Sequence, residues 1–179
     1  MLKTIHTYGD PVLRKKARQI DAINQGVKKL VDDMFETMYA AEGIGLAAPQ
    51  VGESVRLFII DIKPMDSNEG KRVFINPEIV EFGEEKDVYE EGCLSIPTVH
   101  EDVVRPKSIR VKYQSLDGEH HDEWIDTFLA RVIQHEFDHL EGVLFTDRLS
   151  ALKRSLLKNT LKKIANGEIE VELSENYQL

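Results

Sequence analysis

Two histidines and a glutamate stand at helical spacing late in the chain, in the sequence His135-Glu136-Phe137-Asp138-His139. Four residues advance an α-helix by about 400°, so the two imidazoles project from one face and both can bind a single divalent ion. Glu136 lies about 100° around the helix, where its carboxylate is no ligand but can take a proton from a water molecule that the ion activates. The spacing therefore predicts metal-dependent hydrolysis.

A catalytic metal site with two histidine ligands needs a third ligand from the protein. The order His-Glu-x-x-His occurs in many metallopeptidases, and one group adds a glycine and then a third histidine downstream. Gly142 fits that pattern here, but Phe145 stands in place of the histidine. Other metallopeptidases take a downstream glutamate, which only the acidic tail offers, at Glu168, Glu170, Glu172 and Glu175. The tail alternates charged and apolar residues, which is typical of an edge strand rather than a ligand helix, so we expect the third ligand upstream.

A helix that carries two histidines by chance, or a structural metal site, is the alternative interpretation of this motif. Apolar residues around the motif indicate a helix that is buried over much of its circumference, namely Phe128, Leu129, Val132, Ile133, Phe137 and Leu140. A glutamate inside such a helix is costly to bury unless a positive charge pairs with it. A metal ion is the simplest partner of that kind.

The single cysteine, Cys93, excludes an intramolecular disulfide and fits a reducing compartment. Most free cysteines are small buried apolar residues. This one follows Gly92 and precedes Pro97, so the backbone around it is expected to bend. Because a thiolate is a strong ligand for zinc or ferrous iron, Cys93 would complete a site of two histidines and one cysteine with an open fourth position. A site with an open position is catalytic rather than structural.

Length and charge limit the classes of function. The chain has 179 residues, enough for one domain with a full core, and no linker rich in Pro, Gly or Ser divides it. Its 23 Lys and Arg residues against 32 Asp and Glu give a net charge of −9, which argues against DNA binding and against an anionic membrane surface. No signal peptide or membrane-spanning run is apparent. We therefore expect a soluble, cytoplasmic protein.

The apolar periodicity predicts an α+β arrangement. Residues 24–41 form an amphipathic helix of about five turns. Gly43-Ile44-Gly45 breaks it, and residues 46–52 look too irregular for a regular element. Strand-like segments follow at residues 55–61, 72–75, 78–82, 99–104, 108–114 and 121–125.

The remaining signals concern turns and the last helix. Asp117-Gly118 is the clearest hairpin turn. After the His-Glu helix, Ser150 is the expected N-cap of a helix over about residues 150–166. The order predicts a single domain of the α+β class, with mostly antiparallel β-sheets packed around the central helix that carries His-Glu-x-x-His, and with N- and C-terminal helices.

Three segments taken together resemble the peptide deformylase family. They read Gly43-Ile44-Gly45-Leu46-Ala47-Ala48-Pro49-Gln50, Glu91-Gly92-Cys93-Leu94-Ser95 and Gln134-His135-Glu136-Phe137-Asp138-His139-Leu140. Residues 8–14 also look like the family's N-terminal segment, so the resemblance covers nearly the whole chain. Three motifs in the same order at compatible separations are far more specific than any one of them.

The resemblance implies an enzyme that removes the N-terminal formyl group from N-formylmethionine of newly made proteins and releases formate. In this family the metal ligands correspond to Cys93, His135 and His139, and the general acid/base to Glu136. The donors to the tetrahedral oxyanion correspond to the Gln50 side-chain amide and the Leu94 backbone N–H. The implied cofactor is one divalent ion per chain; Fe²⁺ is expected from the resemblance, and sulfur with two imidazoles also accepts Zn²⁺, Ni²⁺ or Co²⁺.

The resemblance also implies where the substrate binds. It places an apolar pocket for the methionine side chain beside the His-Glu helix, with Phe128 and Val132 as lining residues. Backbone groups of Ile44, Gly45 and Gly92 would pair with an extended formylmethionyl peptide as a short added strand, because glycines allow close approach.

This chain departs from the family pattern in two places. His100, seven residues after Cys93, stands where many members have an arginine, which leaves open the substrate preference beyond the first residue. We expect a catalytic domain over residues 1–167 and an acidic C-terminal extension of the same domain over residues 168–179. Some relatives carry a basic helix there that resemblance links to the ribosome, so contact with the ribosome surface through Lys158, Lys162 and Lys163 is a hypothesis.

Two other functions are compatible with parts of the sequence. A generic zinc endopeptidase would share the His-Glu helix, but that function does not explain the segments around Gln50 and Cys93. A non-catalytic metal-binding module would tolerate loss of Glu136 or Gln50, and both residues are present.

Overall fold

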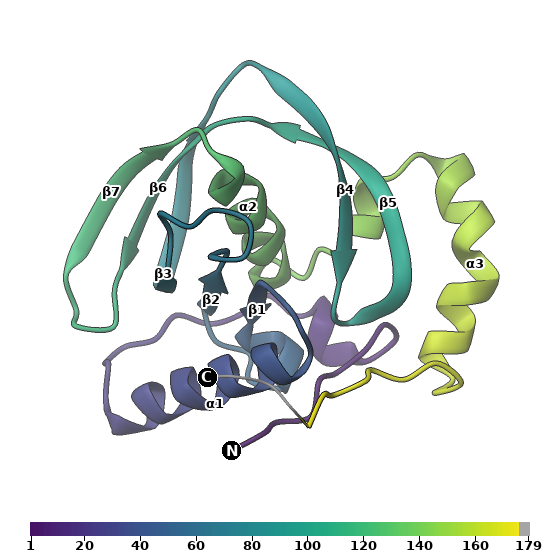
Figure 1. Ribbon diagram of the computed structural model, residues 1–179, viewed down its shortest axis with the longest axis horizontal. Helices are drawn as coiled ribbons and strands as arrows, with labels where there is room; N and C mark the ends of the chain where they lie inside the picture. The colour runs from purple at the N-terminus through teal and green to yellow at the C-terminus, as the bar shows by residue number, and fades with distance from the viewer. Residues whose placement is uncertain (176–179) are drawn as a thin grey trace.

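The computed structural model describes residues 1–175 and has two antiparallel sheets on either side of a central helix (Figure 1). The five-stranded sheet has the strand order β1-β2-β3-β6-β7, and β4 pairs with β5 in a separate two-stranded sheet. The strands are β1 Gly45–Ala47, β2 Leu57–Asp61, β3 Lys71–Phe82, β4 Lys86–Cys93, β5 Ile96–Pro106, β6 Ile109–Gln114 and β7 His120–Ile125. The predicted α+β class is confirmed.

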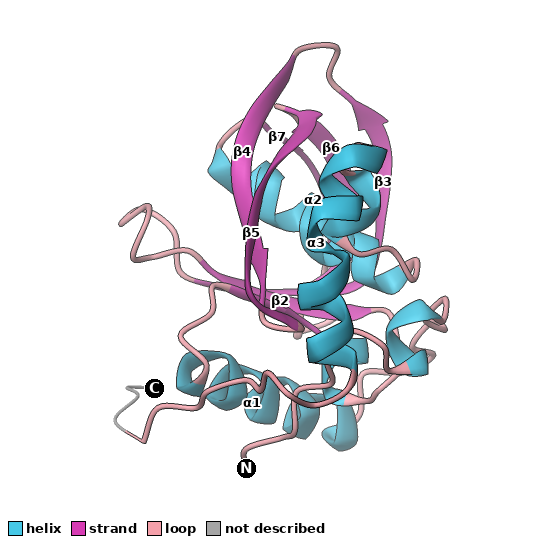
Figure 2. Ribbon diagram, turned by 90° about the vertical axis from the view of Figure 1, so that its right-hand side faces the viewer, coloured by secondary structure: helices cyan, strands magenta, loops and turns pink. Residues whose placement is uncertain are grey.

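Three α-helices complete the fold. They are α1 Gln25–Ala40, α2 Phe128–Leu140 and α3 Ala151–Ala165, and short 3-10 helices occupy Pro11–Arg14, Ala48–Val51 and Phe145–Arg148. Figure 1 shows α2 between the two sheets and α3 on the outer side of β5, and Figure 2 shows α1 beneath β2. The described part of the chain contains no helix long and apolar enough to cross a membrane.

The predicted helix boundaries agree with the structure to within one or two residues. Asn24 caps α1, since its side chain accepts a hydrogen bond of 3.0 Å from the Val27 N–H, and Ser150 caps α3 in the same way from the Lys153 N–H at 3.2 Å. The apolar face of α1 packs on the sheet through buried residues that include Val31, Met34, Phe35 and Met38.

The central helix α2 is buried over most of its length, as its apolar residues predict. After it, Gly142 has a φ of +73°, and a Cβ added there would lie 2.6 Å from the Arg14 carbonyl oxygen. Only glycine suits this position, because the turn needs a positive φ and the N-terminal segment passes directly over it.

Two of the predicted strands are one strand in the structure. The segments at residues 72–75 and 78–82 belong to one strand, β3, whose pairing with β6 shifts register between Ile75 and Glu78. Asn76 causes the irregularity with a φ of +49°, and its side-chain amide both accepts a hydrogen bond from the Ile20 N–H and donates one to the Ile20 carbonyl, each at 2.8 Å. The predicted hairpin turn at Asp117-Gly118 joins β6 to β7, and Gly118 has a φ of +87°.

Two further strands were not predicted. Strand β4 escaped notice because nearly all of its residues are exposed, so charged side chains replace the apolar alternation. Strand β1 lies in the segment judged irregular, and it has only three residues, all buried. Small residues fit there because β1 packs closely between α1 and α2.

The expectation of an edge strand in the acidic tail is wrong for residues 168–175, which form no strand. The alternation there has a different origin, since Ile169 and Val171 are partly buried while Glu168, Glu170 and Glu172 are exposed. The tail is held near its end by the Ser174 N–H, which donates to the Ala40 carbonyl at 2.6 Å. An extended segment with one covered side gives the same pattern as a strand without pairing to a sheet.

Candidate metal centre and active site

Cys93, His135 and His139 converge although two of them come from a helix and the third from a strand. Cys93 is the last residue of β4, and the two histidines lie one turn apart on α2. Their potential ligand atoms all lie within 4.8 Å of one another, and the Cys93 Sγ is 3.4 Å from Nε2 of His139. A thiolate and two imidazoles at this spacing can bind one divalent ion.

His135 is oriented by a buried carboxylate. Its Nδ1 lies 2.8 Å from Oε1 of Glu91, which leaves Nε2 for a metal ion. Burial by itself lowers the pKa of His135, but hydrogen bonds to Cys93 and Glu91 outweigh it and raise the pKa well above its usual value. His139 has no such carboxylate, and burial together with the neighbouring His135 lowers its pKa. His139 is therefore neutral, which is the state in which an imidazole binds a metal ion.

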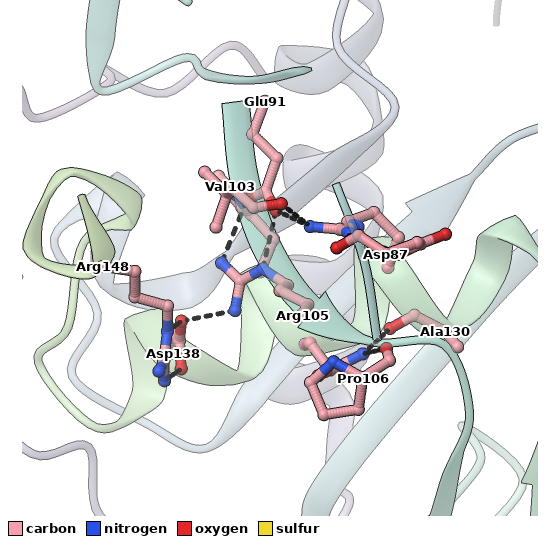
Figure 3. Close-up of polar contacts among 11 residues, drawn as sticks. Asp87, Glu91, Val103, Arg105, Pro106, Ala130, Asp138 and Arg148 are labelled. Atoms are coloured by element: carbon pink, nitrogen blue, oxygen red, sulfur yellow. Dashed lines mark hydrogen bonds and ion pairs between the residues drawn. The ribbon is translucent and has the colours of Figure 1, made fainter. Parts of the chain in front are cut away.

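Two buried arginines hold Glu91. Arg105 donates to both of its carboxylate oxygens, at 2.6 and 3.0 Å (Figure 3). Arg131 donates to one of them at 2.8 Å. Burial raises the pKa of Glu91, but hydrogen bonds from His135 and Arg105 outweigh it, so the pKa is lowered and Glu91 stays ionised. An ionised Glu91 keeps the proton of His135 on Nδ1 and makes Nε2 the metal-binding nitrogen.

The same network continues to Asp138 on α2. Arg105 also donates to Asp138 at 2.9 Å, and Arg148 forms a bidentate pair with that carboxylate at 2.6 and 2.7 Å (Figure 3). Charges buried in this way are stable only when each has its partners. The network therefore fixes β4, β5 and α2 in one arrangement, and with them the positions of the candidate metal ligands.

Glu136 is the carboxylate that has no partner of this kind. It is 4% exposed, and its Oε2 has no hydrogen-bond partner among residues 1–175. Burial raises the pKa of its carboxyl group to about 7. A base with a pKa near the working pH can both accept and return a proton. Gly45 makes room for the group, since a Cβ at that position would lie 2.6 Å from Oε1 of Glu136.

The Gln50 side chain points its amide NH₂ at the same centre. The Ala47 N–H donates to Oε1 of Gln50 at 2.9 Å, so the NH₂ must be the group that faces the other way. Nε2 lies 3.0 Å from the Ser95 hydroxyl and 3.5 Å from the Cys93 sulfur. The backbone of β1 thus fixes a donor beside the three ligands.

A cavity of about 890 Å³ opens onto this centre. The residues predicted to act in catalysis or substrate binding line it together, namely Gln50, Leu94, Glu136, Ile44, Gly45, Gly92, Phe128 and Val132. His135 and Cys93 line it too, and His139 lies behind them, buried. His100 is exposed on its edge and packs over Gly92, where a Cβ would lie 2.6 Å from the imidazole.

The residues that hold the candidate ligands in place were not predicted from the sequence, chiefly Glu91, Arg105, Arg131 and Asp138. The sequence did contain a pattern that pointed to two of them, Arg131 and Asp138. Arg131, His135 and Asp138 stand at i, i+4 and i+7, on one stripe of a helix predicted to be buried. Charged residues on a buried stripe need buried partners, although the stripe alone does not reveal where those partners lie in the sequence.

The side chains present fit a metal ion. Sulfur and imidazole are the donors that zinc and ferrous iron accept, and Nε2 of His135 is left free by the Glu91 contact. The buried, unpartnered oxygen of Glu136 adjoins these donors in the cavity, as a base for a metal-activated water should. An α+β fold with this donor set and this carboxylate defines the class of metal-dependent hydrolases.

Comparison with known proteins identifies the family. The family model described as polypeptide deformylase matches residues 2–155. A peptide deformylase of Christiangramia forsetii is 47% identical, with 96% of this chain and 94% of that protein covered. The chain belongs to the polypeptide deformylase family.

Solved structures agree with this assignment. A peptide deformylase from Legionella pneumophila superposes with a TM-score of 0.85 at 39% identity, covering 94% of this chain and 98% of that one. The peptide deformylase of Thermotoga maritima superposes with a TM-score of 0.78 at 47% identity, covering 84% of this chain and 99% of that one.

Proposed function

We propose that the cavity around Cys93, His135 and His139 is where this chain hydrolyses the formyl amide of N-formylmethionyl peptides. The activity follows from the family: the chain is a metal-dependent deformylase that acts on formylmethionyl nascent peptides and releases formate. The observation that carries the assignment to this cavity is the unpartnered carboxylate oxygen of Glu136, buried beside three metal-binding side chains.

Cys93, His135 and His139 would hold the ion. A divalent ion bound there supplies Lewis acidity, which lowers the pKa of a water ligand and polarises the formyl carbonyl. We propose Fe²⁺ as the physiological ion on the basis of the family resemblance, while the same donors accept Zn²⁺, Ni²⁺ or Co²⁺.

Glu136 moves the proton in this proposal. As the attacking water adds to the formyl carbon, the Glu136 carboxylate takes a proton from it. When the C–N bond breaks, the carboxyl group returns that proton to the leaving amine, which gives formate and a free N-terminus. A pKa of about 7 suits both steps, because neither protonation state is strongly disfavoured.

Gln50 and Leu94 stabilise the oxyanion that forms between these two steps. The NH₂ of Gln50 is directed toward Cys93 by the Ala47 contact, so it needs no rearrangement to donate. The Leu94 N–H is assigned from the family resemblance, and Leu94 lines the cavity. A donor fixed in advance is effective because it costs no reorganisation during the reaction.

The peptide is proposed to bind along β1. This strand is last in the order of the five-stranded sheet, so the described sheet leaves one of its backbone edges unpaired. Gly45 in this strand, Ile44 directly before it and Gly92 across the cavity would offer backbone groups to an extended peptide. The Ile44 carbonyl also accepts from the Asp61 N–H of β2 at 2.9 Å. Phe128 and Val132 line the same cavity and supply apolar surface for the methionine side chain.

The test is formate release from formyl-Met-Ala-Ser by protein purified without oxygen and reconstituted separately with Fe²⁺ and Zn²⁺. We expect turnover with both ions, faster with Fe²⁺, and loss of turnover in Glu136→Gln at unchanged metal content. The exposed Glu119→Gln is the matched control and keeps full activity. Cleavage of an internal-amide peptide at a comparable rate would instead support an endopeptidase.

Contact with the ribosome surface is proposed through α3. Lys158, Lys162 and Lys163 are all exposed on this helix, on the outer side of the molecule (Figure 1). Reversal of the three charges to glutamate should reduce co-sedimentation with ribosomes in a salt-dependent manner. The same reversal at Lys28, Lys86 and Lys112, which are exposed elsewhere, is the control. Equal co-sedimentation of both variants would contradict the proposal.

We also propose that residues 1–167 form the catalytic domain and that residues 168–179 are its C-terminal extension. Ile169 packs on the same cluster as Leu161 and Ile164 of α3, which supports one cooperative unit; residues 176–179 lie outside the described part of the chain. The cytoplasm is the proposed compartment, because the Cys93 thiolate must stay reduced to bind metal. Cell fractionation tests this location.

A further inference from the structure

The N-terminal segment bridges two parts of the candidate active site through its backbone. The His6 N–H donates to the Gln50 carbonyl at 2.7 Å, and the Tyr8 N–H donates to the Ser95 carbonyl at 2.8 Å. Residues 5–8, which we call the N-terminal strap, thus lie against the tip of the β4–β5 hairpin, and Figure 1 shows this segment in purple below that tip. The strap joins two segments that are distant from each other in the sequence.

The strap is held on both sides. Before it, the Lys3 N–H donates to the Thr37 hydroxyl of α1 at 2.9 Å, and Ile5 is buried. After it, Gly9 packs on Ala165 at the end of α3, because a Cβ on Gly9 would lie 2.8 Å from the Ala165 Cβ. A segment that is fixed on both sides can hold the groups to which it is bonded.

The first anchor of the strap is the short helix that carries Gln50. This 3-10 helix, Ala48–Val51, ends at Gly52. The His6 imidazole lies directly over Gly52, where a Cβ would be only 2.8 Å from its Nε2. Nδ1 of the same ring lies 2.6 Å from the Asp10 carboxylate, which fixes the ring in place. Both the backbone and the side chain of His6 therefore contact the helix from which the Gln50 amide projects.

The second anchor is the turn that follows Cys93. Leu94 and Ser95 are the two turn residues between β4 and β5, since Cys93 pairs with Ile96. A two-stranded sheet is only marginally stable by itself, so the position of its tip depends on contacts from outside the sheet. The bond from the Tyr8 N–H to the Ser95 carbonyl is such a contact.

The two anchors together determine where the Gln50 amide lies relative to Cys93. Gln50 is 1% exposed, and its Nε2 is 3.0 Å from the Ser95 hydroxyl and 3.5 Å from the Cys93 sulfur. A shift of the short helix against the turn would move this donor away from the metal centre. A misplacement of about 1 Å can lower the rate of an enzyme about 10²-fold.

We propose that the N-terminal strap positions the Gln50 amide for catalysis through the N–H groups of His6 and Tyr8. The inference rests on the proposed function, because Gln50 must act as an oxyanion donor for its position to matter. None of residues 5–8 lines the substrate cavity, so the strap acts through Gln50 and not on the substrate. Losing either bond should therefore lower kcat and leave KM unchanged.

The test replaces one backbone N–H at a time by an ester oxygen, with the α-hydroxy acid of the same side chain at residue 6 or residue 8. In the full-length enzyme loaded with Zn²⁺, we expect each ester to lower kcat for formyl-Met-Ala-Ser by about 5- to 20-fold at unchanged KM and zinc content. The matched control is an ester at Thr7, whose N–H donates to no group within residues 1–175. Its kcat should stay within about a factor of two of wild type.

A double-mutant cycle separates positioning from a general loss of stability. Gln50→Ala keeps the backbone carbonyl that His6 contacts and removes only the side-chain amide. If the strap acts through that amide, the esters at residues 6 and 8 should change kcat by less than about twofold in the Gln50→Ala background. Urea denaturation should show the same loss of stability from each ester in both backgrounds.

Equal factors of kcat loss in the two backgrounds would overturn the inference, because a contact with only a structural role acts in both. Wild-type kcat in the ester variants would overturn it as well. Both results leave the deformylase assignment in place, since that assignment depends on formate release by the wild type. No formate release by the metal-loaded wild type would overturn the proposed function itself.

Discussion

Glu91 is the residue that connects the metal centre to the rest of the protein. Its carboxylate contacts the Nδ1 of His135, Arg105 and Arg131, all within 3.0 Å. Each contact alone would leave the buried charge under-compensated, and together they keep the carboxylate ionised. The orientation of a candidate metal ligand, His135, thus depends on a residue outside the proposed ligand set.

Replacing Glu91 with glutamine should weaken metal binding. The amide cannot hold the His135 proton as a carboxylate does, and it leaves two buried arginines short of a partner. We expect an affinity for Zn²⁺ that is about 10- to 100-fold lower and a loss of about 3 kcal/mol in the free energy of unfolding. Competition with a chromophoric chelator measures the first, and urea denaturation the second. The neighbouring exposed Glu90→Gln should change neither; an unchanged affinity in Glu91→Gln would contradict the assigned role.

Gln50 should affect the chemical step rather than metal binding. Its NH₂ is fixed by Ala47 on one side and faces Cys93 on the other, so truncation removes an oriented donor without removing a ligand. We expect Gln50→Ala to lower kcat by about 10²–10³ at unchanged metal content. Ser95→Ala, which removes only a partner of Gln50 at 3.0 Å, is the control and should cost far less. A kcat for Gln50→Ala within a factor of three of wild type would exclude the donor role.

At the level of single residues, the sequence indicated the candidate ligands and the base, but it did not indicate the buried charges that hold them in place. The spacing of His135, Glu136 and His139 follows from helix geometry, and Cys93 is the one thiol in the chain. The partners of Glu91 could not be deduced, because Arg105 and Arg131 reach it from a different strand and from the helix. Which buried charges meet is decided by the packing of these elements.

Among the secondary-structure elements, too, some were predictable from the sequence and others were not. Helix α1 was predictable because one apolar face repeats over its whole length. Strand β4 was not, because it pairs with β5 in a two-stranded sheet and keeps most of its side chains in solvent. Apolar periodicity reports burial on one face, so an exposed strand such as β4, which ends at the candidate ligand Cys93, gives no such signal.

Helix α1 has an acid-sensitive contact at Asp33, which is 6% exposed. The Asp33 carboxylate accepts hydrogen bonds from Lys29 at 2.7 Å and from the N-terminal ammonium at 2.8 Å. These contacts lower the pKa of Asp33 below its usual value of 3.8. A depressed pKa in the folded state contributes stability that is present above about pH 3.8 and is lost as the pH falls through the folded-state value.

Asp33→Asn should therefore reduce stability at neutral pH and flatten its decline in acid. Because both cationic partners are exposed, we expect a difference of about 1 kcal/mol or less at pH 7. The difference should disappear once the pH falls below the lowered pKa of Asp33. Thermal melts from pH 2 to pH 7 measure it. The adjacent Asp32→Asn is the control, since Asp32 is exposed and has no ion pair within the described chain. A constant difference between Asp33→Asn and the wild type over the whole range would contradict this origin.

On the scale of the molecule, the candidate metal centre joins parts that are distant in the sequence. Cys93 closes the two-stranded sheet, and the two histidines belong to the helix that the five-stranded sheet covers. The arginine network crosses the same boundary through Arg105 of β5 and Asp138 of α2. A bound ion would therefore strengthen an interface that the protein already makes, rather than create the fold.

This arrangement predicts that removing the metal lowers thermal stability without unfolding the protein. An ion present at about 100 times its Kd stabilises the folded state by about 2.7 kcal/mol. For a chain of this size, 1 kcal/mol shifts Tm by about 2–4 °C, so a chelator should lower Tm by about 5–10 °C and added Zn²⁺ should restore it. Calorimetry with and without chelator measures the shift. Cys93→Ala lacks one ligand and should show little response to either addition. An unfolded metal-free protein would mean that the buried arginine network cannot hold β4 and α2 together, and an unchanged wild-type Tm would mean that the ion does not bridge them.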